Sequence, residues 1–336
     1  MGSSVSIGIA LTLIAGLMSG NCMLPMKFNR RWLFENSWLV FSIVSLIILP
    51  WALALGLVDH LFATYQSLSL VQLAIPFLFG AGWGIAQVLF GISVQRLGLG
   101  LAYAIIIGLG TLLGTLVPLF AQHREQVTTR GLIGILAGVT VMIVGIGLST
   151  RAGQMRERAA HVSSQIIPKS GYITAILLAI LCGLMAPMLN FSFAFGQDIA
   201  RQTVALGNSE IHAAYAVWPI GLAGGCFSNL AYSLYLLRKN RSWGNFKTAL
   251  PDAWLAILMG ALWMGAFALY GMSATLLGSL GTSIGWGLFQ IFMIMTAMLS
   301  GILTGEWKGA PASSKLLLAS GFICLIGATT LLASAK

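Results

Sequence analysis

Ten apolar segments, each about twenty residues long, dominate this sequence. About twenty helical residues cross a hydrocarbon core of roughly 30 Å, and only helices or closed barrels satisfy the backbone inside lipid. The segments are about twice as long as barrel strands and do not alternate strictly. We therefore predict an all-α polytopic membrane protein with ten transmembrane helices, at residues 5–26, 37–58, 73–95, 99–121, 130–150, 171–195, 211–236, 253–273, 283–304 and 315–334.

The charged residues are few and unevenly placed. They make up 8% of the chain, whereas soluble domains carry about 25%, which argues against a soluble protein. The net charge of +10 indicates contact with anionic lipid headgroups rather than with nucleic acid. One set of loops holds 14 basic residues and the other holds 4. The rich set is Lys27, Arg30, Arg31, Arg96, Arg151, Arg156, Arg158, Lys169, Arg238, Lys239, Arg241, Lys247, Lys308 and Lys315, and the poor set is Arg124, Arg130, Arg201 and Lys336.

This asymmetry predicts the orientation of the chain. Loops rich in lysine and arginine remain in the cytoplasm. With an even number of spans, both termini are then expected on the outer side of the membrane. The N-terminal sequence lacks a charged leader region before its first apolar run, so we do not expect a removable signal peptide.

No pattern of catalytic or metal-binding residues is found. The four cysteines lie inside apolar segments without paired spacing, and the four histidines lie in loops or at segment ends. Zinc-protease, hydrolase and phosphate-loop motifs do not occur. We therefore expect neither an enzyme nor an ATP-driven pump, and no cofactor or metal.

One apolar phrase is written twice. LFGAGWGIAQVLFGISVQRLG (Leu78–Gly98) and LMGALWMGAFALYGMSATLLG (Leu258–Gly278) share ten of 21 positions. The phrases cover the third and eighth segments, so the period is five helices, and an odd period inverts the second copy. We predict two inverted five-helix repeats, at 1–150 and 171–336, joined by a cytoplasmic linker at 151–170. Inverted repeats are common in secondary transporters, which bind substrate near the midplane between the repeats.

The polar and aromatic residues inside the segments suggest a neutral site. Buried amides need a neighbouring helix or a polar substrate as partner, and indoles at depth need a flat face to cover. Sugars offer hydroxyls for amides and C–H faces for aromatic rings. We expect an uncharged polyhydroxylated substrate, with candidate binding residues Trp83, Gln87, Trp263, Tyr270, Trp286 and Gln290, followed by Asn21 and Asn190.

None of the eight acidic residues falls in the middle of a predicted segment. An acid inside the membrane is the usual proton carrier. Glu306, expected to close the ninth helix, and Glu35, expected to open the second, lie nearest to the membrane. They are interfacial charges or caps in one interpretation, and proton-coupling residues at an inner gate in the other.

Several motifs make a family resemblance. NCMLPMKFNRRWLFENSW begins at Asn21, GWGIAQVLFGISVQRLG lies at 82–98, TRAGQMRER at Thr150–Arg158 and GEWKG at Gly305–Gly309. With them the whole chain resembles the L-rhamnose–proton symporter family of the drug/metabolite transporter superfamily. The resemblance implies ten helices in two inverted halves and inward movement of L-rhamnose or a related 6-deoxy sugar with a proton, by alternating access.

The resemblance also bears on single positions. Gln87 matches a family amide in the third helix, and Trp263, Tyr270 and Trp286 match family aromatics. The family pattern has an acid around Thr282 and a histidine where this chain has Phe289. Sodium coupling, an uncoupled facilitator or exporter of small metabolites such as amino acids, and a membrane sensor that does not transport therefore stay open, as does the oligomeric state.

Overall fold

A computed structural model describes residues 2–122, 124–159, 169–248 and 250–335, and these residues form helices and short connections without a strand. The first part holds α1 (Gly2–Asn21), η1 (Leu24–Phe28), α2 (Phe34–Ile43), η2 (Val44–Ile48), α3 (Leu49–Leu57), α4 (Leu61–Gln66), α5 (Leu70–Leu97), α6 (Leu99–Gln122), η3 (Arg124–Gln126) and α7 (Thr129–Ala159). The second part holds α8 (Lys169–Met185), α9 (Met188–Phe195), α10 (Gln197–Ala205), α11 (Glu210–Ala213), η4 (Ala214–Ala216), α12 (Val217–Lys239), η5 (Ser242–Lys247), α13 (Leu250–Leu276), η6 (Gly278–Leu280), α14 (Gly281–Leu303) and α15 (Ala312–Ser334).

The prediction of ten transmembrane helices is confirmed, because ten stretches of the described chain are long and apolar enough to cross a membrane. Two of them extend at least nine residues beyond the predicted end. Helix α7 continues past residue 150 to Ala159, so the first part of the predicted linker is helical. The sixth stretch continues through α9 and α10 to Ala205. Residues 160–168 of the predicted linker lie outside the described residues.

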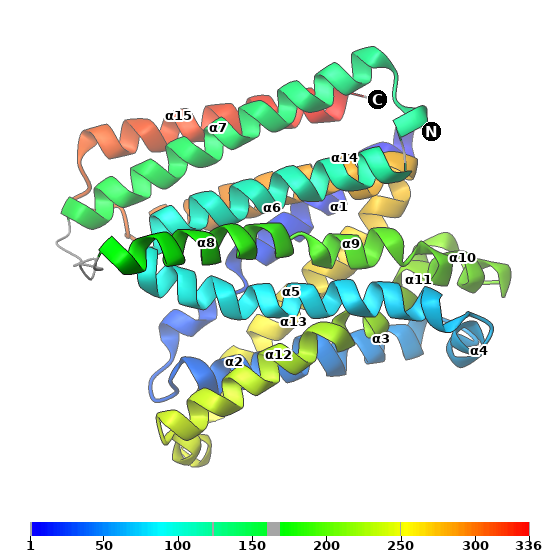
Figure 1. The fold of residues 1–336 in the computed structure, drawn as a ribbon, viewed down its shortest axis with the longest axis horizontal. Helices are drawn as coiled ribbons and strands as arrows, with labels where there is room; N and C mark the ends of the chain where they lie inside the picture. Colours follow the sequence, from blue (N-terminus) through cyan, green and yellow to red (C-terminus); the bar gives the residue numbers. More distant parts are fainter. Residues whose placement is uncertain (1, 123, 160–168, 249, 336) are drawn as a thin grey trace.

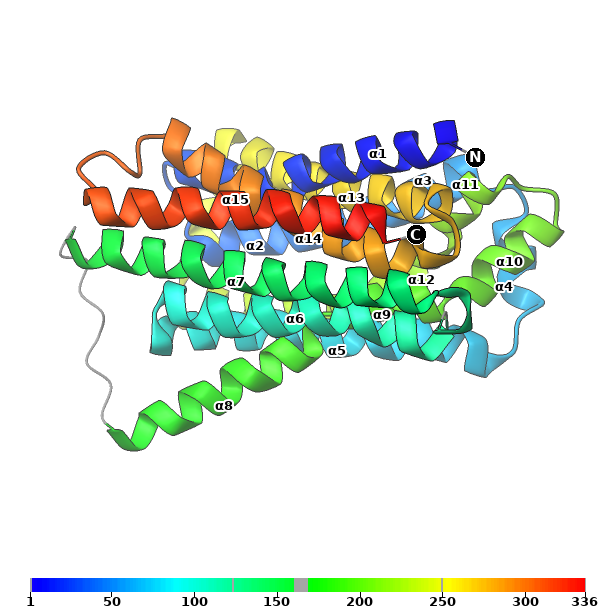
Figure 2. The ribbon, with the colours of Figure 1, turned by 90° about the horizontal axis from the view of Figure 1, so that it is seen from above.

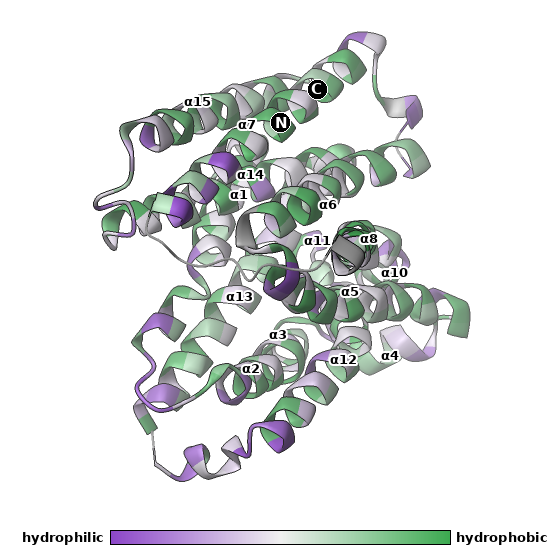
Figure 3. Ribbon diagram, turned by 60° about the vertical axis from the view of Figure 1, so that its left-hand side comes forward, coloured by the Kyte–Doolittle hydropathy of each residue, from purple (hydrophilic) through white to green (hydrophobic). Residues whose placement is uncertain are grey.

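The helices run roughly along one direction, which gives the bundle two ends (Figure 1). Helices α7 and α12 finish at the left of Figure 1, and their last turns carry Arg156, Arg158, Arg238 and Lys239. We call this the basic end. Both chain termini are marked at the opposite end. Hydrophilic residues gather near helix ends and in connections, while the helix shafts are mainly hydrophobic (Figure 3), as expected for helices that face lipid.

Glycines allow two helices to approach at backbone distance. A Cβ atom on Gly80 of α5 would lie 1.7 Å from the carbonyl oxygen of Gly221 in α12. One turn further, a Cβ on Gly84 would lie 2.6 Å from the carbonyl oxygen of Gly225. Gly80 and Gly84 are four residues apart, as are Gly221 and Gly225, and both pairs serve helix packing here, the usual role of such small-residue pairs in membranes.

Helices from the two parts of the chain pack against each other. Helix α1 packs against α13 and α14, and α8 packs against α5 and α6. Helix α12 packs on α5, and α2 packs on α13. Helices α7 and α15 pack on each other along one side of the bundle (Figure 1). Figure 2 shows the Lys169 end of α8 slanting away from the other helices.

The sixth stretch is broken where it crosses the bundle. Helix α8 ends at Met185, and Pro187, which cannot donate a backbone hydrogen bond, stands before the first residue of α9. Helix α9 in turn ends before Gly196, where α10 begins. These breaks place Asn190 at the centre of the bundle and Gln197 at the mouth of a cavity.

Candidate substrate site

A row of aromatic rings fills the middle of the bundle. Trp83 of α5 and Trp263 of α13 are stacked, with centroids 5.4 Å apart and planes 24° apart. Phe267 lies 4.4 Å from Trp263, and Phe289 lies 5.4 Å from Phe267 and 5.7 Å from Trp286. The two tryptophans of the repeated phrase thus touch each other rather than face each other across an open space.

Asn190 ties four helices together beside this row. Its Oδ1 accepts a hydrogen bond of 2.6 Å from the Tyr270 hydroxyl, and its Nδ2 donates to the carbonyl oxygens of Gly114 and Thr282, both at 2.9 Å. Asn190 and Tyr270 are fully buried. All polar atoms of the Asn190 amide are therefore occupied, which favours a structural role in this conformation.

The indole ring of Trp286 in α14 packs against two glycines of α6, Gly110 and Gly114. A Cβ on Gly114 would lie 2.1 Å from the indole nitrogen, so only glycine leaves room for this ring. The indole N–H donates to the carbonyl oxygen of Gly110 at 3.4 Å. Two glycines four residues apart in α6, Gly110 and Gly114, therefore position an aromatic side chain.

Gln87 and Gln290 are the candidate amides without a hydrogen-bond partner among the described residues. Gln290 is 6% exposed and Gln87 is half-buried. Neither side chain forms a hydrogen bond with the described residues, in contrast to Asn190. A buried amide without a partner loses about 1–3 kcal/mol relative to a paired one. These two amides are thus the ones that a polar ligand at the midplane would satisfy.

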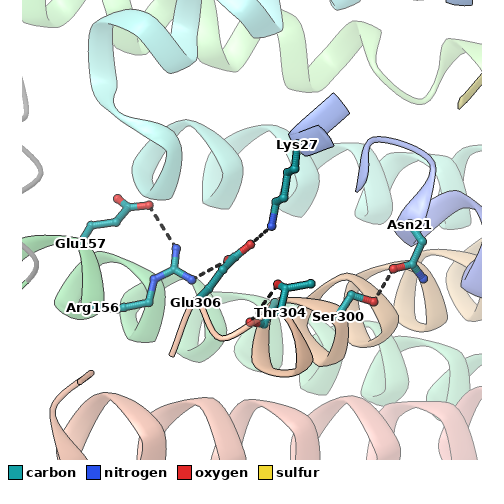
Figure 4. A network of polar contacts seen from close by, with 8 residues as sticks. Asn21, Lys27, Arg156, Glu157, Ser300, Thr304 and Glu306 are labelled. Carbon is teal, nitrogen blue, oxygen red and sulfur yellow. Dashed lines mark hydrogen bonds and ion pairs between the residues drawn. The ribbon is translucent and has the colours of Figure 1, made fainter. Parts of the chain in front are cut away.

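Asn21 lies apart from the aromatic row. It is the last residue of α1, its Nδ2 donates to the carbonyl oxygen of Leu17 at 2.7 Å, and its Oδ1 accepts from the Ser300 hydroxyl. Figure 4 shows Asn21 and Ser300 beside the ionic contacts of the basic end. The other seven predicted residues belong to α5, α9, α13 and α14, whereas Asn21 lies at the basic end.

Glu306 is the centre of an ionic cluster at the basic end (Figure 4). It lies in the connection just after α14, which ends at Leu303, one residue before the predicted end of the ninth span. Its carboxylate accepts hydrogen bonds from Lys27 and, at 2.9 Å, from Nη1 of Arg156. The Lys27 ammonium, and then the Arg156 guanidinium, hold the pKa of the Glu306 carboxyl below its ordinary value. The carboxylate thus joins segments following α1, ending α7 and following α14.

Glu35 has a different environment. It is 3% exposed, and its Oε1 accepts hydrogen bonds from Nδ2 of Asn240 at 3.0 Å and from the hydroxyl of Ser242 at 2.6 Å. It has no ion-pair partner among the described residues. These contacts hold the connection between α12 and α13 against the start of α2.

Sequence reasoning missed one buried acid, Asp252. Its carboxylate accepts hydrogen bonds from the backbone N–H groups of Arg30, Arg31 and Trp32, at 2.8–3.2 Å. Asp252 is 1% exposed, although it lies in the first turn of α13. Its position directly before an apolar run resembles an ordinary helix start, so the sequence carried no signal for this long-range contact.

Two cavities lie on either side of the midplane along α14. The basic-end pocket has a volume of about 200 Å³ and includes Ser149, Ile294, Met298, Arg156, Glu306 and Trp307 in its wall. The opposite cavity, which we call the vestibule, has a volume of about 600 Å³ and includes Gln122, Phe193, Gln197, Asp198, Thr275 and Thr282 in its wall.

Helix α14 contributes residues to the walls of both cavities. Thr282 in the vestibule precedes Trp286 by one turn, and Ile294 in the basic-end pocket follows Gln290 by one turn. Trp286 and Gln290 therefore lie between the cavities on a continuous part of the helix. The eight candidate residues line neither cavity, because the midplane is packed in this conformation.

Two cavities separated by a packed midplane, in a bundle with ten apolar membrane-length stretches, are an arrangement expected of a polytopic membrane transporter. The sequence model of the L-rhamnose-proton symport protein (RhaT) family matches residues 1–335 of this chain. This chain belongs to that family, a family of transporters and not of enzymes, and it is a multi-pass protein of the bacterial inner membrane. The family resemblance seen in the sequence is confirmed.

Curated relatives agree with the family assignment. The L-rhamnose-proton symporter of Escherichia coli O1:K1 / APEC is 28% identical over 340 residues, which covers 98% of this chain and 98% of the relative. The proteins of the same name from Escherichia coli strain 55989 and from Shigella boydii serotype 18 are also 28% identical, with the same coverage.

Proposed function

We propose that this protein imports L-rhamnose or a related 6-deoxy sugar together with a proton. The observation that carries the proposal is the family match over residues 1–335, together with relatives that are named L-rhamnose-proton symporters. The composition of the midplane supports the substrate class. Stacked indoles offer apolar faces to a sugar ring, and the unpaired amides of Gln87 and Gln290 offer hydrogen bonds to its hydroxyls.

The transport cycle is alternating access. The basic end faces the cytoplasm, in accord with the positive-inside rule, and both termini face the periplasm. Sugar enters from the vestibule, separates the aromatic row at Trp83, Trp263, Tyr270 and Trp286, and leaves through the basic-end pocket. The inverted repeats at 1–150 and 171–336 supply two equivalent sets of helices for the two openings. Sugar and proton drive the cycle only if they bind the outward-open and inward-open conformations with different affinity.

Glu306 is the coupling residue in this proposal. Its contacts with Lys27 and Arg156 hold the basic end closed while the carboxylate is ionised. Protonation of Glu306 removes the negative charge that attracts Lys27 and Arg156, and the basic end can then open. Glu35 is the second candidate, because its buried carboxylate contacts only the neutral partners Asn240 and Ser242.

The test is uptake of labelled L-rhamnose into proteoliposomes, with and without an imposed pH gradient. Symport predicts accumulation above equilibrium when the outside is acidic, and alkalinisation of the medium during uptake. Equilibration that ignores the gradient indicates an uncoupled facilitator, and dependence on a sodium gradient indicates the other ion. Absence of sugar flux in either direction, with flux of amino acids instead, favours the metabolite exporter.

A further inference from the structure

The vestibule is larger than the basic-end pocket, and it lies at the end where both chain termini emerge. Its wall comes from the ends of α6 and α13, from the break between α9 and α10, and from the start of α14. Its volume of about 600 Å³ lies within the usual range for small-molecule sites. A monosaccharide therefore fits without any opening of the packed midplane.

Two glutamine side chains in this wall are held in fixed orientations. Nε2 of Gln122 donates to the carbonyl oxygen of Ala194 at 3.1 Å, and Nε2 of Gln197 donates to the carbonyl oxygen of Phe193 at 2.9 Å. Neither amide oxygen has a hydrogen-bond donor within the described chain. Both oxygens are thus positioned acceptors for the hydroxyl groups of a ligand.

The charges of the vestibule are paired. Asp198 accepts hydrogen bonds from Arg201 and, at 3.2 Å, from Nε2 of Gln72. One carboxylate and one guanidinium leave the wall without net charge. This arrangement favours an uncharged polar ligand over an anion or a cation, because either ion would meet a repelling partner at close range.

Thr282 has an unpaired hydroxyl at the inner end of the vestibule. The residue is 9% exposed, and its Oγ1 has no hydrogen-bond partner. Its carbonyl oxygen is held by Asn190, so the start of α14 is fixed in place. Buried hydroxyls normally have partners, and Thr282 belongs to the cavity wall, one turn from Trp286. A ligand hydroxyl in the vestibule would supply the missing partner once the Thr282 side chain turns its buried Oγ1 toward the cavity.

We propose that the vestibule is a second monosaccharide site, which holds the sugar before the midplane opens. Thr282 and the amide oxygens of Gln122 and Gln197 bind sugar hydroxyls there, and Trp286 separates this site from the midplane site. The inference rests on the proposed function for the class of substrate. It assigns to this chain a binding step that comes before the conformational change.

The vestibule contains its own control residue. Thr275 also lines the cavity, but its hydroxyl already donates to the carbonyl oxygen of Gly271 at 3.1 Å. Replacing either threonine with valine keeps the side-chain shape. Thr282→Val removes a hydroxyl available to a ligand, while Thr275→Val removes one that is occupied within the helix.

The experiment measures binding of radiolabelled L-rhamnose to the purified full-length protein in detergent. Thr282→Val is expected to weaken binding about 3–10-fold, the usual effect of one lost hydrogen bond, and Thr275→Val to leave it unchanged. The unliganded Thr282→Val protein should melt no lower than the wild type, because the variant loses only an unpaired buried hydroxyl. A lower melting temperature would assign the hydroxyl to structure and overturn the proposal.

A second arm separates the vestibule from the midplane. In a Gln87→Ala background, which weakens the midplane site, residual sugar binding should persist and should fall when Thr282→Val is added. Equal binding by wild type and Thr282→Val, or equal loss in both threonine variants, overturns the vestibule site while the proposed function stands. Absence of any L-rhamnose binding or uptake by the wild type overturns the proposed function itself.

Discussion

The ionic cluster around Glu306 makes a quantitative prediction about the closure of the basic end. Glu306→Gln keeps the size of the side chain and an oxygen acceptor, but it removes the charge that attracts Lys27 and Arg156. Both partners are far from Glu306 in the sequence: Lys27 is 279 residues away and Arg156 is 150 residues away. We expect the variant to open the basic end more often than the wild type.

The magnitude follows from the exposure of the three side chains. Their exposed fractions are 48% for Lys27, 35% for Glu306 and 21% for Arg156. Solvent screens pairs of this kind, and each contributes about 0.5–1 kcal/mol. Loss of both contacts therefore costs about 1–2 kcal/mol, and the ratio of open to closed protein rises about 5–30-fold.

The same contacts determine the pH dependence. Because Lys27 and Arg156 lower the pKa of Glu306 in the closed state, closure is strongest above the ordinary carboxyl pKa. The stabilisation declines as pH falls through the ordinary value and disappears below the lowered one. Acid therefore opens the basic end of the wild type, and Glu306→Gln should abolish this dependence.

The assay is the rate of maleimide labelling of Ser149→Cys in a background without native cysteines. Ser149 is 4% exposed and lines the basic-end pocket two helical turns from Arg156, so labelling requires opening. Glu157→Gln is the matched control, since the ion pair of Glu157 within the described residues is with Arg156, at 3.8 Å and on the same helix. Equal labelling rates in wild type and Glu306→Gln would refute the reasoning, as would an equal increase in the control.

Three further predictions concern binding and packing. Gln87→Ala should lower L-rhamnose uptake while membrane insertion stays normal, as measured by uptake per inserted protein; unchanged uptake removes Gln87 from the site. Gly80→Ala should lower the melting temperature in detergent, at a cost of about 1–3 kcal/mol or more, because its Cβ would overlap the Gly221 carbonyl, whereas Gly147→Ala, with no atom within 4 Å, should not. Asp252→Ala should cost roughly 2–4 kcal/mol, because three backbone N–H groups lose their acceptor, and an unchanged melting temperature would contradict this role.

Much of the candidate site was visible in the sequence because residue type limits what can be buried in lipid. Buried indoles and amides are uncommon enough to mark Trp83, Trp263 and Gln290 individually. Their state of pairing was not visible, since Asn190 and Gln290 look alike in sequence, yet only Asn190 has hydrogen-bond partners among the described residues. The same holds for Thr282 and Thr275, whose difference depends on side-chain orientation.

The sequence by itself determined the membrane class, the number of helices, the basic end and the family. Each of these depends on the composition or on short motifs of individual segments. Only the tertiary structure decided how the helices combine. It placed α1 with α13 and α14, brought Trp83 onto Trp263, and set Glu306 between Lys27 and Arg156. The reason is physical: lipid immersion constrains each helix locally, whereas helix pairing depends on the shapes of surfaces that are far apart in the chain.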